Sequence, residues 1–319
     1  MSNSTGDCAA GRKLSLLKTK ALAPLLTGGA ATRDRVIGTL CAVMVVFLFS
    51  SFTLVSRLGF SSSLQVIDIA AIRFSISGVV LTPVLWRYGL SGVRWREAAA
   101  LAFCGGLGFA LLAFTGFSLA PATHGGVLLH GTLALTTSVL AWIGLRTPTT
   151  RGRMLGLLAI LAGIAAMAWD SVATSSGHQL LGDCALLLAS FSWSAYGLLA
   201  RQLGLSSAHT ASIVTVLSMC CFMPTYLMLP GAGRTLLSAG PTELVLQGTF
   251  QGLLIGVASP FLYSRAVASL GAAETAVFTA AVPCVTVVAA IFLLGEAPSS
   301  AAILGAVIVT IGMAAALKG

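Results

Sequence analysis

The sequence predicts an all-α integral membrane protein of ten transmembrane helices, arranged as two inverted five-helix repeats. Three observations lead to this prediction: the chain is strongly apolar, its apolar runs have the length of membrane spans, and its two halves resemble each other. Of the 319 residues, 57% are hydrophobic and only 8% are charged, whereas a soluble domain carries about 25% charged residues. So few charges cannot cover a globule in water, and most of the surface must therefore face the lipid bilayer.

Ten apolar runs approach the roughly 20 residues of helix that cross the hydrocarbon. In chain order they are Val36–Val55, Val66–Trp86, Ala98–Leu119, His124–Ile143, Met154–Trp169, Leu181–Ala200, Ala211–Leu229, Leu244–Val267, Ala272–Leu294 and Ala301–Leu317. The first 34 residues are polar and basic, and we expect a flexible cytoplasmic tail there. The expected organisation is this tail (1–34), a first repeat (35–171) and a second repeat (180–319).

The 18 Lys and Arg residues indicate the orientation. With an internal N-terminus, fifteen of them fall in the tail, the cytoplasmic loops or the C-terminus, Arg57 and Arg234 fall outside, and Arg73 lies within a span. The positive-inside rule then predicts that both termini are cytoplasmic, in the inner or plasma membrane of the cell. Because these charges are spread over short loops and do not form a basic patch, we expect no nucleic-acid partner.

An internal repeat relates the first five runs to the last five. At one constant offset Gly38, Phe47, Ser50, Leu54 and Arg57 recur as Gly182, Phe191, Ser194, Leu198 and Arg201, and near the ends of the halves Gly156 and Gly163 recur as Gly305 and Gly312. Since five spans per half is an odd number, the second copy enters the membrane from the other side. Inverted repeats of this kind are typical of alternating-access transporters.

The chain resembles the drug/metabolite transporter superfamily, in particular its ten-helix members with paired EamA domains. The residues that carry the resemblance are Gly182-Asp183, Ser192 to Tyr196, Arg201, Tyr263 to Ala266, Leu270 to Ala273, Pro283, Leu294-Gly295-Glu296, Gly305, Gly312 and, in the first half, Arg73. The first half departs from the family pattern, because it has no counterpart of Pro283 or Glu296. The resemblance implies a secondary transporter of small organic solutes, an exporter of metabolites or drugs.

Ionisable groups within the spans need a partner or a cavity, because burying them in lipid costs at least about 2.5 kcal/mol. Arg73 is either an anchor for an anionic substrate group or a structural hydrogen-bond donor to another helix. Asp68, five residues before it, has poor helical spacing for a direct pair. His130, in the fourth run, is either a packing residue or a substrate and proton ligand.

Several aromatic and hydroxyl residues at mid-span on the repeat-related first and sixth runs can face a shared central cavity, or can simply pack the helices. The candidate substrate-binding residues are therefore Arg73, Ser50, Phe52, His130, Trp193, Ser194, Tyr196 and Tyr263. Ser259-Pro260 and Pro283 could interrupt their helices and free a carbonyl toward the cavity.

Glu274 and Glu296 lie at opposite ends of the ninth run and are candidates for proton or cation coupling, or residues that extend to the membrane interface. Asp183, at the start of the sixth run, is explained by helix capping. The two histidines His124 and His130 lack acidic neighbours at ligand spacing, so we expect no metal site and no cofactor.

The predicted function is alternating-access transport of a small organic solute, coupled to protons or to exchange. A non-transporting membrane scaffold or sensor is the alternative, and an intramembrane enzyme is a weaker one. The HExxH pattern is absent and Asp183 has no second Asp at depth, so we expect no enzyme. A P-loop is absent as well, which argues against ATP-driven transport. The sequence does not indicate an oligomeric state.

Overall fold

The computed structural model of the protein describes residues 6–62, 64–90, 92–145, 150–174 and 177–318, with side chains from residue 32 onward except at 145, 170, 173, 174, 273 and 318. The described residues form helices and short connections, and no strand occurs among them. The predicted all-α membrane fold is therefore confirmed.

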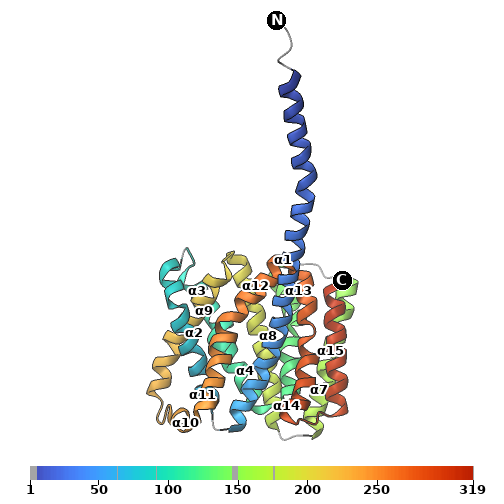
Figure 1. Ribbon diagram of the computed structural model, residues 1–319. Helices are drawn as coiled ribbons and strands as arrows, with labels where there is room; N and C mark the ends of the chain where they lie inside the picture. The colour runs from blue at the N-terminus through green and yellow to red at the C-terminus, as the bar shows by residue number, and fades with distance from the viewer. Residues whose placement is uncertain (1–5, 63, 91, 146–149, 175–176, 319) are drawn as a thin grey trace.

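Eighteen helical segments follow one another along the described chain (Figure 1). They are α1 (Gly6–Ser62), α2 (Val66–Tyr88), α3 (Trp95–Ala102), η1 (Phe103–Leu107), α4 (Gly108–Leu119), α5 (Ala122–Gly125), η2 (Gly126–Gly131), α6 (Leu133–Leu145), α7 (Arg151–Thr174), α8 (Gly177–Leu203), α9 (Ser207–Met228), α10 (Arg234–Ser238), α11 (Pro241–Gln247), η3 (Gly248–Ala258), α12 (Ser259–Leu270), α13 (Ala272–Thr279), α14 (Val282–Leu294) and α15 (Ser300–Lys318). The segments labelled η are π-helical.

Ten stretches within the described residues are long and apolar enough to span a membrane. Their bounds are Thr32–Ser62, Val66–Tyr88, Trp95–Leu119, Ala122–Gly144, Arg151–Trp169, Gly177–Leu203, Ser207–Met228, Pro241–Leu270, Glu274–Leu294 and Ser300–Leu317. Each coincides with one of the ten predicted runs. Most extend beyond the predicted ends, because a helix continues through polar flanking residues that a hydropathy criterion leaves out.

The N-terminal helix α1 projects from the bundle, and the C-terminus lies at the same end of the bundle (Figure 1). Residues 1–5 of the predicted tail (1–34) lie outside the described residues, and α1 begins at Gly6. The flexibility of this tail stays a prediction.

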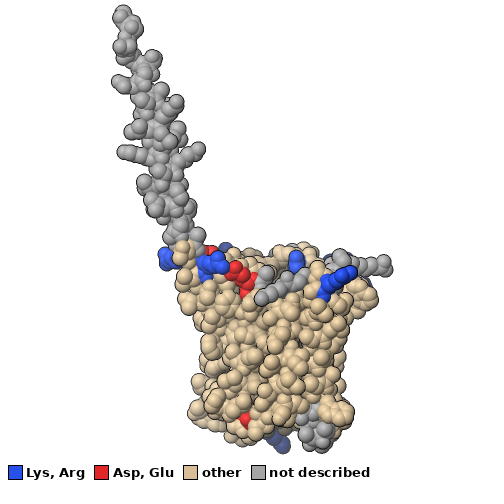
Figure 2. Space-filling model, turned by 90° about the vertical axis from the view of Figure 1, so that its right-hand side faces the viewer, with Lys and Arg blue, Asp and Glu red and all other residues tan. Residues whose placement is uncertain are grey.

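On the face shown in Figure 2, charged side chains gather at the two ends of the bundle, and the belt between them shows none. On the face shown, most of them lie at the end from which α1 projects. Exposed apolar side chains such as Phe47, Trp142, Leu155 and Phe292 lie within the spans. A surface of this kind is stable in lipid and not in water.

The two halves interlock so that each span packs against spans of the other half. The third span (α3, η1, α4) packs on the sixth (α8), and the first (α1) packs on the eighth (η3, α12). Likewise the fourth span packs on the sixth and the first on the ninth (α13, α14), while the second packs on the seventh (α9) and the fifth (α7) on the tenth (α15). Exchanging the first five spans for the last five maps this set of contacts onto itself. The packing therefore fits an inverted repeat.

Helical irregularities also recur at equivalent places in the two halves. The third span contains the π-helical segment η1, and the eighth contains η3. The fourth span contains η2, and the ninth is interrupted at Ala280 and Ala281, before α14 begins at Val282 with Pro283 in its first turn. The π-helical segments are rich in glycine, which allows other helices to approach closely: a Cβ on Gly256 would lie 2.6 Å from Cβ of Ser77.

Candidate functional site

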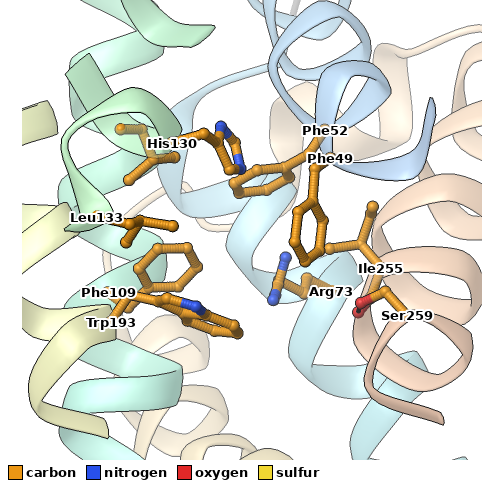
Figure 3. Close-up of a pocket in the computed structure, with 10 residues that line it drawn as sticks. Phe49, Phe52, Arg73, Phe109, His130, Leu133, Trp193, Ile255 and Ser259 are labelled. Carbon is orange, nitrogen blue, oxygen red and sulfur yellow. Dashed lines mark hydrogen bonds between the residues drawn. The ribbon is translucent and has the colours of Figure 1, made fainter. Parts of the chain in front are cut away.

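A pocket lies among the helices of both halves (Figure 3). Its lining residues are Phe49, Phe52, Arg73, Phe109, Leu129, His130, Leu133, Trp193, Ile255 and Ser259. They belong to the first, second, third, fourth, sixth and eighth spans.

Four aromatic rings form most of the walls. Phe109 and Trp193 have ring centres 4.7 Å apart, and Phe52 lies 6.1 Å from Phe109 in a stacked arrangement. Phe49 stacks on His130 at 5.4 Å. Because Phe49 and Phe52 are three residues apart on α1, both rings project from one face of that helix.

Arg73, on α2, is the only charged residue among the ten that line the pocket. Its residue exposure is 7%, and its guanidinium carbon lies 5.3 Å from the centre of the Phe52 ring. Nη1 makes no hydrogen bond, and within the described residues Arg73 has no ion pair. In Figure 3 the guanidinium points into the space between the Phe109–Trp193 pair and the rings of α1.

Asp68 does not serve as the counter-ion of Arg73. Its carboxylate accepts hydrogen bonds from the hydroxyl of Tyr226 at 2.6 Å, from the backbone N–H of Gln65 at 3.0 Å, and from the hydroxyl of Thr235. This acid ties α2 to the seventh span and to α10. A direct ion pair between Arg73 and Asp68 is thus absent from the described contacts.

His130, on η2, is the second ionisable residue of the pocket. Its exposure is 7%, and its Nδ1 atom has no hydrogen-bond partner among the described residues. Ser259 is the remaining polar lining residue, and its hydroxyl donates to the Ile255 carbonyl at 2.8 Å. The pocket therefore combines one fixed positive charge, one imidazole with an unused nitrogen and largely aromatic walls.

Four of the eight predicted substrate-binding residues line the pocket: Phe52, Arg73, His130 and Trp193. Two others hold helices together nearby. The hydroxyl of Ser50 donates to the Val282 carbonyl at 3.4 Å, and that of Ser194 is bonded to Thr136 at 2.7 Å and Thr137 at 2.9 Å.

The two predicted tyrosines lie outside the pocket lining. The Tyr196 ring centre is 5.0 Å from that of Trp193, so it supports this wall from behind. Gly105 makes room for the Tyr196 ring, because a Cβ there would lie 2.4 Å from it. Tyr263 is 38% exposed and does not contact the cavity.

The two coupling candidates lie away from the pocket at opposite ends of the ninth span. Glu274 forms an exposed ion pair with Arg35 at 2.9 Å. Glu296 accepts hydrogen bonds from the backbone N–H groups of Ala122 at 2.7 Å and Thr123 at 3.1 Å, and thereby caps α5. Arg57 lies 3.9 Å from the same carboxylate.

Sequence reasoning named Ser259 as part of a possible helix interruption, and not as a lining residue. It missed the apolar part of the lining: Phe49, Phe109, Leu129, Leu133 and Ile255. Phe49 carried a signal, because it lies opposite Trp193 in the repeat. The others carried none, since an apolar residue in an apolar span looks the same whether it faces lipid, core or cavity.

Among the described residues no three His, Cys, Asp or Glu side chains are placed to hold a metal ion. The six cysteines that the structure describes are unpaired with one another.

Comparison with known proteins supplies the family and the fold. The sequence model of the EamA-like transporter family matches residues 36–169 and 180–317. A solved structure described as "Crystal structure of protein" is similar to this chain with a TM-score of 0.58 and 19% identity, over 88% of this chain and 96% of the other. At that identity the similarity supports the fold alone. No curated protein matches the sequence at a significant level.

Proposed function

The chain belongs to the EamA-like transporter family, and from this premise we propose that it carries a small organic solute through the central pocket by alternating access. Membership makes the protein a membrane transporter of the drug/metabolite type. The solute-binding role of the pocket, the rocking of the halves, export from the cell and coupling to a proton or an exchanged solute are parts of the proposal. We also propose the inner or plasma membrane as its location, with both termini cytoplasmic.

The observation that carries the proposal is that both repeats contribute lining residues to the pocket. Phe52, Arg73 and His130 come from the first half, and Trp193, Ile255 and Ser259 come from the second. A movement of one half against the other would therefore change the pocket itself. Transporters with inverted repeats bind substrate at such a junction.

The interlocking contacts between the halves support a second conformation of similar energy. Since the contact set maps onto itself when the halves are exchanged, a second state in which the halves swap conformations has the same kinds of contacts and a similar energy. An outward-open and an inward-open state can then interconvert without a large free-energy difference.

Cysteine accessibility tests alternating access without knowledge of the solute. Ser259→Cys would be made in a background in which the seven native cysteines are replaced. A membrane-impermeant thiol reagent would then be applied separately to right-side-out and inside-out vesicles. Controls are Ser61→Cys and Gln202→Cys, exposed residues that we expect on the outer and inner sides, respectively.

Alternating access predicts that Ser259→Cys is labelled from both sides, whereas each control is labelled from one side only. Labelling of Ser259→Cys from a single side under all conditions would contradict it. The pocket would then belong to a static protein, as in a membrane scaffold or sensor.

A further inference from the structure

We infer that the pocket selects an aromatic organic anion: a planar apolar group that carries a single carboxylate or a similar monoanion. As a statement about what is carried across the membrane, this inference rests on the proposed transport function. As a statement about binding, it depends only on the pocket.

The charge of the ligand follows from Arg73. Buried charges in proteins are paired or hydrogen-bonded, because an isolated one loses its hydration without compensation. Arg73 is 7% exposed, its Nη1 makes no hydrogen bond, and the nearby carboxylate of Asp68 is occupied by Tyr226, Thr235 and Gln65. A guanidinium that points into a cavity in this state is complementary to an anion.

The same pocket disfavours cations and neutral amides. None of its ten lining residues is an Asp or Glu, so a cation would meet the field of Arg73 without a counter-charge. A planar guanidinium binds a carboxylate through two parallel hydrogen bonds. A neutral amide offers one acceptor oxygen and no charge, so it loses most of this interaction.

The rest of the ligand follows from the walls. Phe109 and Trp193, in contact at 4.7 Å, line the same cavity as the guanidinium, and Phe52 stacks on Phe109 at 6.1 Å (Figure 3). Aromatic faces favour stacking on a flat ring. Arg73 is the only charged residue among the ten that line this pocket, so a ligand with a single anionic group matches it.

His130 adds a polar contact to this arrangement. It is held by stacking on Phe49 at 5.4 Å, and its Nδ1 atom is without a partner. A neutral imidazole can donate or accept through that nitrogen. It can therefore hydrogen-bond to a hydroxyl or a second oxygen of the ligand. This contact does not require a second negative charge on the ligand.

Four matched probes test the inference on the purified full-length protein in detergent. Phenylacetate is the aromatic anion, phenylacetamide the neutral analogue, 2-phenylethylamine the cation, and cyclohexylacetate the anion without an aromatic ring. Binding is read as the rise in melting temperature with ligand concentration. We expect phenylacetate to bind about ten- to a hundredfold more tightly than phenylacetamide, as the loss of charge-assisted hydrogen bonds implies. Phenylethylamine should give no shift, and cyclohexylacetate a weaker one than phenylacetate.

Three variants assign the effect to the guanidinium. Arg73→Gln should abolish the phenylacetate shift, whereas Arg73→Lys, which keeps the charge but loses the planar fork, should retain a weaker one. Arg94→Gln removes an exposed arginine and should leave the shift unchanged. Because Arg73→Lys keeps the charge, it keeps the test valid if Arg73→Gln fails to fold.

The inference is overturned if phenylacetamide or phenylethylamine binds as well as phenylacetate, if none of the four probes binds at millimolar concentration, or if Arg73→Gln keeps the full shift. Proteoliposome counterflow of phenylacetate separates this failure from that of the proposed function. Binding that depends on Arg73 without counterflow would support the anion site and contradict transport. Two-sided labelling of Ser259→Cys without anion binding would support alternating access and contradict the anion site.

Discussion

Gly156 on α7 and Gly312 on α15 pack backbone against backbone, and a Cβ on Gly156 would lie 2.6 Å from the Gly312 carbonyl oxygen. Gly163 and Gly305 repeat this contact, with a distance of 2.8 Å from the corresponding Cβ to the Gly305 oxygen. In the internal repeat Gly156 corresponds to Gly305 and Gly163 to Gly312, so one contact is the symmetry mate of the other. The fifth and tenth spans therefore form a tight seam that has no residue in the pocket lining.

A bulky residue in this seam should destabilise the fold. We expect Gly312→Leu to lower the free energy of unfolding by about 1–3 kcal/mol or more, because overpacking against backbone cannot be relieved by a rotamer change. The measurement is thermal unfolding in detergent. Gly197→Ala is the control, since a Cβ at this exposed helical position meets nothing within 4 Å. It should be neutral or slightly stabilising. An unchanged melting temperature for Gly312→Leu would contradict the close contact.

Asp183 connects three spans through one carboxylate. Its oxygens lie 2.9 Å from Nδ1 of His124 and 2.5 Å from the hydroxyl of Ser171, and all three residues are buried. Asp183→Ala should cost about 1–3 kcal/mol, because it removes the acceptor of two buried hydrogen bonds. Asp183→Asn can still hydrogen-bond to both neighbours and should cost less. Equal melting temperatures for the two variants would show that the carboxylate is not the connecting group.

Glu296 stabilises the start of the fourth span through the backbone N–H groups of Ala122 and Thr123. Glu296→Ala should lower the free energy of unfolding by about 1 kcal/mol, the usual cost of a lost helix cap. Glu296→Gln should retain part of it. Glu274→Gln, which breaks an exposed ion pair with Arg35, should change stability by less than about 1 kcal/mol. Thermal unfolding in detergent measures all three. A larger loss for Glu274→Gln than for Glu296→Ala would contradict this assignment.

The spans and the repeat were accessible from the sequence because each depends on a pattern of many residues. Ten apolar runs are read from hydropathy, and the inverted arrangement follows from an odd number of spans per half. Arg73 and His130 were equally visible, since a polar residue inside a membrane span needs an explanation. All four pocket residues that were predicted have a polar atom, an unusual ring or a place in the repeat.

The sequence alone did not predict which candidate residues line the pocket and which hold helices together. Ser50 and Ser194 have the same chemistry as Ser259, yet only Ser259 lines the cavity. The explanation of Asp183 as a helix cap is wrong, because α8 begins at Gly177 and Asp183 lies inside the helix, where His124 and Ser171 are its partners. Such choices depend on helix rotation and on pairing between distant spans. The periodicity of apolar residues determines neither the rotation of a helix nor its partner spans, because lipid, core and cavity all favour apolar side chains.

Arg73 itself provides the last prediction, on stability in the absence of ligand. If Arg73 is structural, replacing it removes interhelical hydrogen bonds and destabilises the fold. If Arg73 instead binds a ligand and has no partner in the empty protein, replacing it removes an unpaired buried charge. Arg73→Met keeps much of the side-chain length and removes that charge. We expect its free energy of unfolding to stay equal to that of the wild type or to rise by up to about 2 kcal/mol, since the cost of an unpaired buried charge exceeds the gain from the cation–π contact with Phe52.

Phe52→Ala is the matched comparison. It removes a ring that is 2% exposed and packs on Phe114 and Phe117, and it should cost about 3–5 kcal/mol. Thermal unfolding without ligand distinguishes the two interpretations of Arg73: a loss for Arg73→Met as large as that for Phe52→Ala would make the guanidinium a structural group, and the anion site would then lack its anchor.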